Sequence, residues 1–295
     1  MIELRSHEAV MVQEVIKNLL INNQGNYVDC TFGQGGHTAA ILKNLGEKGS
    51  LTALDKDPFS DEMALKISLK DKRMRFINDS FGNIEKHFEK ESLDGALLDL
   101  GISSYQLDDP KRGFSFKKLG PLDMRIDQTS SFSAEFWLNN SSKEEIEKVF
   151  KEMGEEKQSR KIASLICEKR QKKPIKTTKD LLEIILFCKS KSTKRHPATN
   201  IFRAIRMRVN SELEELRNVL EGVGKVLKIG GRLVVISFHS IEDRTTKRFI
   251  QGRDTAGIKF NFKLVGGKPI KADPTEIIKN PRSRSAILRI AEKVS

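Results

Sequence analysis

The chain has 295 residues, 38% of them hydrophobic, which is enough to bury the core of one large domain or two ordinary ones. No segment approaches the ~20 consecutive apolar residues that a membrane helix needs. Residues 1–8 lack the apolar stretch of a signal peptide. Three cysteines that lie far apart in the sequence argue against a disulfide framework or a zinc site and favour a reducing cytoplasm. The formal net charge of +13 points to a polyanionic partner.

This positive charge is concentrated in one segment. Residues 157–208 contain 16 Lys and Arg against 3 acidic residues, and 16 − 3 = +13 equals the net charge of the whole chain. The rest of the chain is therefore balanced. The segment is either a solvated helical surface or a face that binds phosphates, and its concentration favours the second.

The first half of the chain alternates between helix-like and strand-like patterns. We expect helices at 8–20 and 37–45 and a third that Pro58 opens, with strands at 26–31, 50–54, 73–78 and 93–98. Strands that alternate with helices at this spacing predict an α/β domain with a mostly parallel sheet and helices on its faces.

The alternation stops between residues 110 and 210, where only helical patterns such as 143–153, 160–170 and 179–187 occur. It resumes with a helix at 212–227 that Gly230 and Gly231 close, followed by strands at 232–237, 259–265 and 285–290. We therefore predict a core formed by residues 1–110 and 212–295, with an inserted helical domain at 111–211.

A glycine-rich turn joins the first strand to the next helix. It contains Gly33, Gly35 and Gly36, and such a turn lets the backbone approach a ligand and point free N–H groups at it. Asp55 ends the following strand, 20 residues after Gly35, where a carboxylate can accept hydrogen bonds from ribose hydroxyls. The G-x-G-G spacing differs from the G-x-G-x-x-G of dinucleotide sites, so the pattern predicts a nucleotide or adenosine site rather than specifically NAD.

Two further strands end in chemically useful residues. Phe81 follows the third strand and either stacks on an adenine or packs under its helix. Asp99 ends the fourth strand and is followed by Ser103 and Ser104. Because ligands of such folds bind at the carboxyl ends of parallel strands, we favour a functional role for Asp99 over a simple capping role.

Several segments resemble the bacterial 16S ribosomal RNA cytosine-N4 methyltransferases. The matching motifs are DLGISS at 99–104, QLDD at 106–109, RGFSF at 112–116, GPLDMR at 120–125, HPAT at 196–199, R-x-x-VNSEL at 206–213, SFHSIEDR at 237–244 and NPRSRS at 280–285. With the glycine-rich loop, the resemblance covers essentially the whole chain.

The resemblance implies a class I S-adenosylmethionine-dependent methyltransferase fold with an inserted helical substrate domain. It implies methyl transfer to the exocyclic N4 amine of a cytidine in the decoding region of 16S ribosomal RNA, with S-adenosyl-L-homocysteine as the other product and no metal. The family's cofactor contacts fall on Gly35, Gly36, His37, Asp55, Phe81, Asp99 and Gln106, of which only His37 and Gln106 were not already indicated by the residue pattern.

One position departs from the family. Tyr105 stands where the family usually has proline, between Ser104 and Gln106. Proline would stiffen the turn, so the placement of Gln106 depends on this position. Tyr105 either stacks on the target base or is a neutral replacement.

The amine of cytosine is a poor nucleophile because its lone pair is delocalised into the ring. An enzyme helps by accepting hydrogen bonds from that amine and aligning it with the methyl sulfonium. The D/N/S-P-P-Y/F sequence that many amino-methyltransferases use is absent. We therefore expect Ser103, Ser104 or a neighbouring backbone carbonyl to accept from the amine.

Other residues are candidates for binding the RNA. Trp137 and Phe136 either form a stacking platform for bases or belong to a helix core. His239 either lines the substrate pocket or satisfies a backbone carbonyl. The candidates for phosphate and substrate contacts in the inserted domain are Lys194, Arg195, His196, Arg203, Arg206, Arg208 and Asn210, and Arg206 and Asn210 share a helix face by their spacing.

Three alternatives stay open at this point. An NAD-dependent dehydrogenase shares the loop and Asp55, a DNA amino-methyltransferase shares the cofactor site, and a non-catalytic RNA-binding factor shares the fold. We expect a cytoplasmic enzyme whose partner is 16S rRNA in an assembled or late-assembling small ribosomal subunit, with no membrane association. The sequence leaves the oligomeric state, the target nucleotide and the choice between naked RNA and subunit open.

Overall fold

The computed structural model describes residues 9–188, 196–253 and 260–295. The chain forms two compact units. The sheet unit comprises Met1–Gly101 and Leu213–Ser295, and the helical unit comprises Ile102–Glu212. The predicted boundary at 110–111 lies later than this division because Ile102 and Leu107 already pack against the apolar core of the helical unit.

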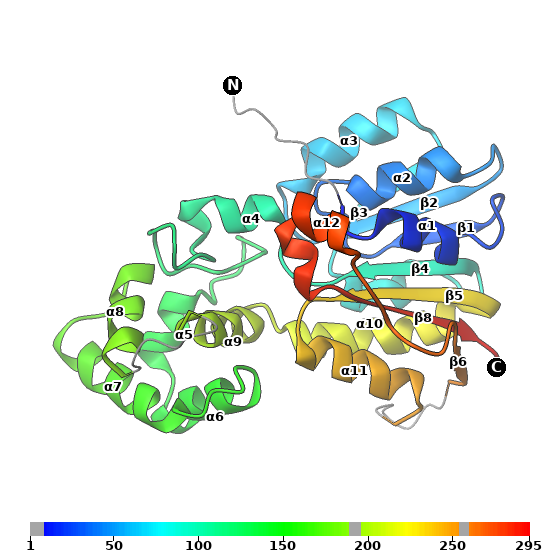
Figure 1. The fold of residues 1–295 in the computed structure, drawn as a ribbon. Coiled ribbons are helices and arrows are strands. Elements are labelled where there is room, and N and C mark those ends of the chain that lie inside the picture. The colour runs from blue at the N-terminus through cyan, green and yellow to red at the C-terminus, as the bar shows by residue number, and fades with distance from the viewer. Residues whose placement is uncertain (1–8, 189–195, 254–259) are drawn as a thin grey trace. The chain divides into compact units, whose positions relative to one another are not determined.

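The sheet unit is built on one twisted sheet (Figure 1). Its strands are β1 (Asn26–Asp29), β2 (Ser50–Asp55), β3 (Met74–Asn78), β4 (Leu93–Asp99), β5 (Leu227–Ser237), β6 (Phe262–Leu264), β7 (Ile270–Lys271) and β8 (Ile287–Lys293). Their order is β3-β2-β1-β4-β5-β8-β6, with β7 beside β8. The five strands β1 to β5 are parallel, and β8 runs antiparallel to β5. The predicted mostly parallel, Rossmann-like α/β architecture is therefore confirmed.

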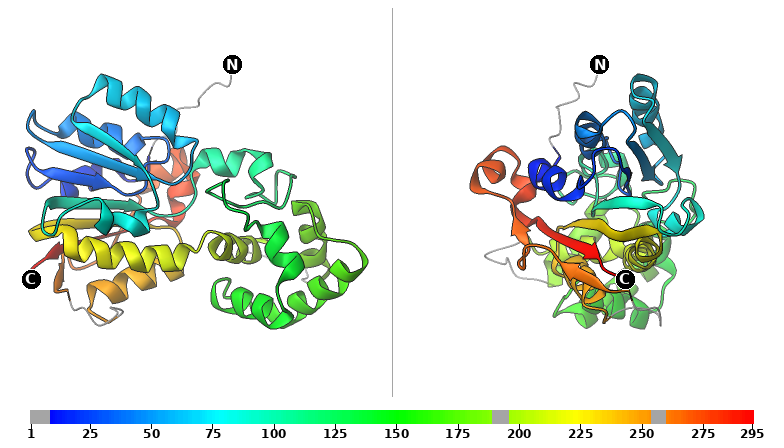
Figure 2. Two further views of the ribbon diagram at one scale, coloured as in Figure 1. Left: turned by 180° about the vertical axis from the view of Figure 1, so that it is seen from behind. Right: turned by 90° about the vertical axis from the view of Figure 1, so that its right-hand side faces the viewer.

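Helices cover both faces of this sheet, which Figure 2 shows from two further sides. They are α1 (Val12–Leu19), α2 (Gly36–Asn44), α3 (Ser60–Lys70), η1 (Phe81–Lys86), α10 (Glu212–Val226), α11 (Ser240–Ile250), α12 (Pro274–Lys279) and η3 (Pro281–Ser285). Neighbouring residues of β4 face opposite sides, since Leu97 joins the apolar cluster of α1 and α2 while Leu98 joins that of α10. A strand buried on both faces reads as a continuous apolar run, which is why it was visible in the sequence.

Several element boundaries differ from the sequence-based expectation, and two of these differences have a clear cause in the backbone. β5 begins at Leu227 rather than after the glycine pair, because its pairing with β4 shifts register between Leu93 and Gly95 and Gly230 adopts a φ of 83° inside the irregular stretch. Helix α1 begins at Val12 because Met11 has a φ of 54°, which a right-handed helix cannot contain. β7 has only two residues and was missed.

The helical unit contains α4 (Ser104–Asp108), η2 (Pro110–Arg112), α5 (Ala134–Asn140), α6 (Lys143–Glu152), α7 (Ser159–Lys172), α8 (Thr178–Cys188) and α9 (Thr199–Val209). The starts of α5 and α6 follow from their sequence: Ser133 and Ser142 each accept a backbone N–H of the first turn through the side-chain oxygen. The helices enclose a separate apolar core. Among the residues that the structure describes, no helix is both long and apolar enough to span a membrane.

Candidate functional site

Acidic and amide side chains gather at one edge of the sheet unit. Strands β1 to β4 end at Asp29, Asp55, Asn78 and Asp99, and all four run in the same direction. Their carboxyl ends therefore meet at one edge, as Figure 1 shows beside α2 and α12. This is the edge at which sheets of this kind bind ligands.

The glycine-rich loop lies between β1 and α2 at this edge. Gly33 and Gly35 have φ values of 55° and 77°, a left-handed conformation that side chains disfavour. A Cβ atom on Gly35 would lie 2.7 Å from Ile67 Cδ1, and one on Gly36 would lie 2.9 Å from Ala9 Cβ. The loop is therefore a close-packed backbone turn in which larger residues do not fit.

Asp55 anchors this loop from the neighbouring strand. Its Oδ2 accepts a hydrogen bond of 2.7 Å from the backbone N–H of Gly33, and its Oδ1 accepts one of 2.9 Å from the N–H of Asp57. Burial raises the pKa of Asp55, while these hydrogen bonds act in the opposite direction. The carboxylate thus holds the loop in place and has lone pairs left for a ribose.

A buried histidine lies between the carboxylates of β1 and β4. His37, in the first turn of α2, is 4% exposed, and its Nε2 lies 3.4 Å from Asp99 Oδ2. Asp29 is fully buried, and its Oδ2 accepts a hydrogen bond of 2.7 Å from the hydroxyl of Thr38. This bond fixes the residue that follows His37. Burial lowers the pKa of His37, but the carboxylates of Asp99, Asp29 and Glu276 outweigh it and raise the pKa above its ordinary value.

Three buried side-chain atoms of this cluster, His37 Nδ1, His37 Nε2 and Asp99 Oδ1, have no hydrogen-bond partner among the described residues. His37 Nε2 lies in the ion pair with Asp99 Oδ2, which leaves His37 Nδ1 and Asp99 Oδ1. Buried polar atoms are normally satisfied, so their presence at the ligand-binding edge is an argument for a polar ligand. A glycine cradle, a ribose-type carboxylate and these two atoms fit the adenosine and amino acid parts of S-adenosylmethionine.

Phe81 begins η1, after the third strand. It is half-buried and packs against the apolar cluster beneath α10, as one of the two alternatives proposed. Ser80 caps the turn by accepting from the N–H of Gly82. Contact of the remaining ring surface with an adenine stays a prediction.

In the helical unit, Ser103 and Gln106 form a reciprocal cap at the start of α4. Ser103 Oγ accepts a hydrogen bond of 3.3 Å from the N–H of Gln106, and Gln106 Oε1 accepts one of 2.9 Å from the N–H of Ser103. Tyr105 continues the helix in place of the family's proline. In this conformation the side-chain oxygen of Gln106 is bound within its own turn, so its contact with the cofactor remains a prediction, as do the roles of Ser103 and Ser104.

Two of the candidates for RNA contact have structural roles, and for Trp137 this is the second of the two alternatives given above. Trp137 is 1% exposed, packs edge-on against Phe150 and donates its Nε1–H to Glu145 at 2.8 Å. It is therefore a core residue and not a stacking platform. Asn210 is buried, and its side-chain amide donates a hydrogen bond of 2.7 Å to the carbonyl of Met124. This bond connects the end of α9 to the loop that contains Met124.

The arginines of α9 are also engaged within the helical unit. Arg206 binds both carboxylate oxygens of Glu212 at 2.8 Å, and Arg203 donates to the carbonyl of Gly154 at 3.1 Å. Arg208 pairs with Glu145 at 3.2 Å. Helix α9 therefore uses its charges mainly for internal contacts, which weakens their assignment to phosphates.

His196 is exposed and stacks on Phe116 with 4.4 Å between the ring centroids. Its Nδ1 accepts from the N–H of Ala198. It stays a candidate for RNA contact. Lys194 and Arg195 lie outside the described residues.

The positive surface of the helical unit lies on other residues. Exposed cations of and around α7 include Lys157, Arg160, Lys161, Lys169, Lys172 and Lys173. All six belong to the basic segment 157–208 recognised in the sequence. The predicted basic face is thus present on α7 rather than on α9.

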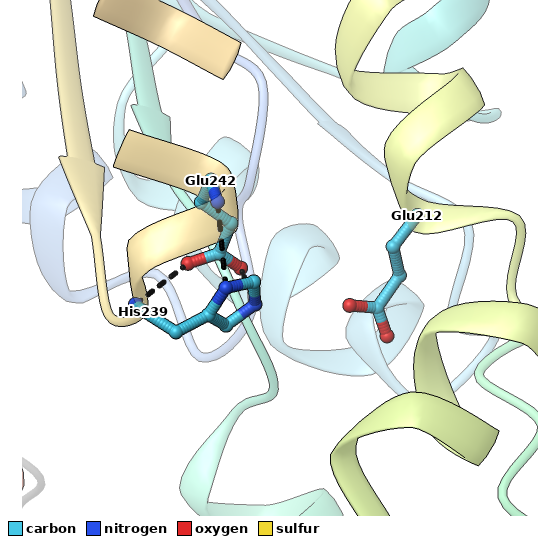
Figure 3. Close-up of side chains that lie close together, drawn as sticks. All are labelled: Glu212, His239 and Glu242. Carbon is cyan, nitrogen blue, oxygen red and sulfur yellow. Dashed lines mark hydrogen bonds and ion pairs between the residues drawn. The ribbon is translucent and has the colours of Figure 1, made fainter. Parts of the chain in front are cut away.

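His239 caps α11 (Figure 3). Its Nδ1 accepts 3.4 Å from the N–H of Glu242, and its Nε2 lies 3.0 Å from Glu242 Oε1. The other Glu242 oxygen accepts from the backbone N–H groups of Phe238 and His239. His239 therefore accepts a hydrogen bond from a backbone N–H, whereas the sequence analysis proposed that it donates to a backbone carbonyl. Its role in a substrate pocket stays a prediction. Glu212, which is also drawn in Figure 3, belongs to the helical unit and binds Arg206 there.

Sequence reasoning missed Asp29 and Glu276. Asp29 carried a usable signal, because it is the last residue of the first strand and directly precedes the glycine-rich loop. Glu276, on α12, accepts 2.7 Å from the N–H of Met11 and raises the pKa of His37 from a distant part of the sequence. Nothing local could have revealed that contact.

Comparisons with known proteins identify the family of the chain. The model of the MraW methylase family matches residues 5–294. "Ribosomal RNA small subunit methyltransferase H" of Coxiella burnetii (strain Dugway 5J108-111) is 44% identical over 99% of this chain and 100% of its own, and that of Legionella pneumophila (strain Paris) is equally similar, with the same coverage. A solved SAM-dependent O-methyltransferase from Thermotoga maritima aligns with 99% of this chain and 69% of its own at 11% identity and a TM-score of 0.46. The match over nearly the whole chain sets aside the dehydrogenase alternative, and the protein belongs to the MraW methylase family.

Proposed function

We propose that the protein transfers a methyl group from S-adenosylmethionine to the exocyclic N4 amine of a cytidine in the decoding region of 16S ribosomal RNA. The arrangement of the glycine-rich loop, Asp55 and the His37–Asp99 pair at one sheet edge carries this proposal. The ribosomal RNA methyltransferases that are 44% identical over their full length support the choice of substrate. The substrate is the assembled or late-assembling small subunit in the cytoplasm.

The sheet unit binds the cofactor. When bound, S-adenosylmethionine supplies an electrophilic methyl group on a sulfonium. Asp55 holds the loop through Gly33 and accepts hydrogen bonds from the ribose. The backbone N–H of Gly36, at the start of α2, faces the ligand, while that of Gly35 closes the turn by donating to the carbonyl of Phe32. His37, which lies between the carboxylates of Asp99 and Asp29, offers Nδ1 to the amino acid part, and Asp99 Oδ1 accepts a hydrogen bond from the cofactor.

The cytidine amine needs an acceptor for one of its hydrogens. Accepting a hydrogen bond from it localises the nitrogen lone pair, and this matters most as positive charge develops in the transition state. We assign this role to Ser103, Ser104 or a backbone carbonyl next to them. The base has to be unpaired or flipped out to present its amine.

The helical unit recognises the RNA. Its exposed cations on α7 bind phosphates, and His196, stacked on Phe116, lies on its surface as a further contact for RNA. Gln106 is a further proposed contact of the cofactor; its Oε1 is bound in the cap with Ser103.

Mass spectrometry of ribosomal RNA tests the proposal directly. Ribosomal RNA from cells that lack this protein should contain no N4-methylcytidine at the target position. The modification should appear when small subunits isolated from these cells are incubated with the purified protein and S-adenosylmethionine. A variant with Asp55→Ala should bind subunits normally and fail to restore the modification. If N4-methylcytidine is unchanged in the deletion strain, the proposed substrate is wrong; if the Asp55→Ala variant restores subunit assembly without methylation, the non-catalytic alternative is favoured.

A further inference from the structure

The segment that joins α12 to β8 is a short basic turn at the reactive edge of the sheet unit. Residues 279–285 contain Lys279, Arg282 and Arg284 and no acidic residue, and all three cations are exposed. The inserted helical unit is not involved, since this segment belongs to the sheet unit. The proposed site residues do not include any part of it.

Its backbone is held by its own polar residues. Ser283 is fully buried and donates two hydrogen bonds to the carbonyl oxygen of Asn280. The bond from its hydroxyl is 2.7 Å long and the bond from its backbone N–H is 2.9 Å long. Asn280 Oδ1 accepts 3.3 Å from the N–H of Arg282. Pro281 occupies the first position of η3, where its fixed φ favours the turn. The result is a rigid turn with an arginine on either side of its buried serine.

The sheet register places this turn beside the cofactor residues. Asp99 pairs with Ile236 of β5, and Ile236 pairs with Leu288 of β8, so the three lie in one row across the sheet. Two steps between strands span about 10 Å. β8 is antiparallel to β5, and the turn that precedes it therefore lies at the carboxyl edge of the parallel strands, where α12 and η3 are drawn in Figure 1.

A second contact ties the same segment to the cofactor site. Glu276 of α12 accepts a hydrogen bond from the N–H of Met11 and raises the pKa of His37 by its charge. Ile277 and Ala286, which flank the turn, pack in the apolar cluster of α1 and α2. The arginines are thus attached to a well-packed support next to the reactive edge rather than to a loose loop.

We propose that η3 is a phosphate-binding turn, in which Asn280, Pro281 and Ser283 set the backbone and Arg282 and Arg284 bind the phosphates of the RNA strand that carries the target cytidine. This inference rests on the proposed function. Guanidinium groups bind phosphate oxygens in a bidentate geometry, and support by a rigid turn reduces the entropy lost on binding. Leu288, three residues after the turn, lies about 10 Å from Asp99, so the turn holds nucleotides within a few positions of the target base.

The test compares two pairs of exposed cations on the same unit. The first variant is Arg282→Gln with Arg284→Gln. The matched control is Lys72→Gln with Arg75→Gln, which removes the same charge at the amino end of β3, the opposite edge of the sheet. Binding of a fluorescein-labelled, cytidine-rich single-stranded RNA is measured against salt concentration, together with S-adenosylmethionine affinity and with KM and kcat on isolated small subunits.

The Arg282/Arg284 variant should weaken RNA binding about tenfold and reduce the slope of log K against log salt by about 1.4, or 0.7 for each lost phosphate contact. KM for subunits should rise, while cofactor affinity stays unchanged. The control should keep the slope of the wild-type protein. Ser283→Ala, which keeps both charges and loses the support of the turn, should weaken RNA binding without the full change in slope.

Equal slopes and KM values for the arginine variant and the wild type would overturn the phosphate-binding turn, even if the wild-type protein methylates the RNA. An equal loss in the control would also overturn it, because the effect would then be one of total charge. Absence of methyl transfer by the wild-type protein would instead contradict the proposed function, and the slope comparison would still decide the role of the turn.

Discussion

Replacing Gly35 by alanine tests whether the loop before α2 needs its close backbone packing. Two costs follow from the structure. A left-handed residue with a side chain costs about 1–2 kcal/mol, and Gly35 has a φ of 77°. The new Cβ would also lie 2.7 Å from Ile67 Cδ1 and 3.0 Å from the ring of Phe32, an overpacking that costs about 1–3 kcal/mol. The free energy of unfolding should therefore fall by about 2–5 kcal/mol.

Gly230 provides the matched control. It has a φ of 83° but no atom within 4 Å of the position of its Cβ, so Gly230→Ala should lose only about 1–2 kcal/mol. Unfolding in urea should be followed by far-UV circular dichroism, because Trp137, the single tryptophan, lies in the helical unit and does not report on the sheet unit. Calorimetry should show weakened binding of S-adenosylmethionine for Gly35→Ala alone. Equal destabilisation by the two substitutions, or unchanged cofactor binding by Gly35→Ala, would refute the close-packing argument.

Three further changes have clear expected outcomes. Trp137→Ala should lower the free energy of unfolding by about 3–5 kcal/mol in a denaturant titration followed by circular dichroism, because Trp137 is a core residue. The control Phe136→Ala, at a ring that is 51% exposed, should lower it by less than about 0.5 kcal/mol, and a weaker RNA affinity of the folded Trp137→Ala variant would instead support a stacking role. Asp55→Ala should weaken S-adenosylmethionine binding about 10- to 100-fold in calorimetry, because the loop loses the hydrogen bond between the N–H of Gly33 and Asp55. An affinity equal to that of the wild type would contradict the role of Asp55 in cofactor binding. Because the pKa of His37 is raised in the folded state, its protonation stabilises the fold fully below about pH 6.5, and this stabilisation is lost as the pH rises through the raised pKa. His37→Gln should therefore flatten the dependence of the free energy of unfolding on pH above about pH 6.5, and the same pH dependence in the variant and the wild type would contradict this role of His37.

The cofactor edge was predictable because its signals are local. A glycine-rich turn has to follow a strand, and the parallel order of the strands brings their last residues to one edge, so the positions of Asp55 and Asp99 follow from the topology alone. The hydrogen bond from Gly33 to Asp55 adds a mechanical role that spacing does not reveal. The contribution of Glu276 was not predictable, since it depends on how α12 packs against α1.

The candidate RNA contacts of the helical unit were harder to judge from the sequence for a physical reason. Trp137, Arg206 and Asn210 are residue types that serve equally well in a core and on a binding surface. The four-residue spacing of Arg206 and Asn210 indicated a shared helix face, and Asn210 does donate to the carbonyl of Arg206, but the face points inward. A helical period shows which residues lie together and leaves open whether that face meets solvent.

Charge is a better guide once burial is known. The basic segment contains arginines of α9 that are engaged with Glu145, Glu212 and Gly154, and cations of α7 that are exposed. An arginine that already binds a carboxylate would lose that interaction if it bound a phosphate instead, which reduces its net contribution. Lys172 and Lys173 also pair with carboxylates, Glu168 at 4.0 Å and Asp180 at 3.8 Å, but exposed pairs of this kind contribute little and are lost at small cost. Binding of phosphate also releases counterions from the RNA. The electrostatic part of RNA binding should therefore depend on α7 and η3, whereas α9 mainly stabilises the helical unit.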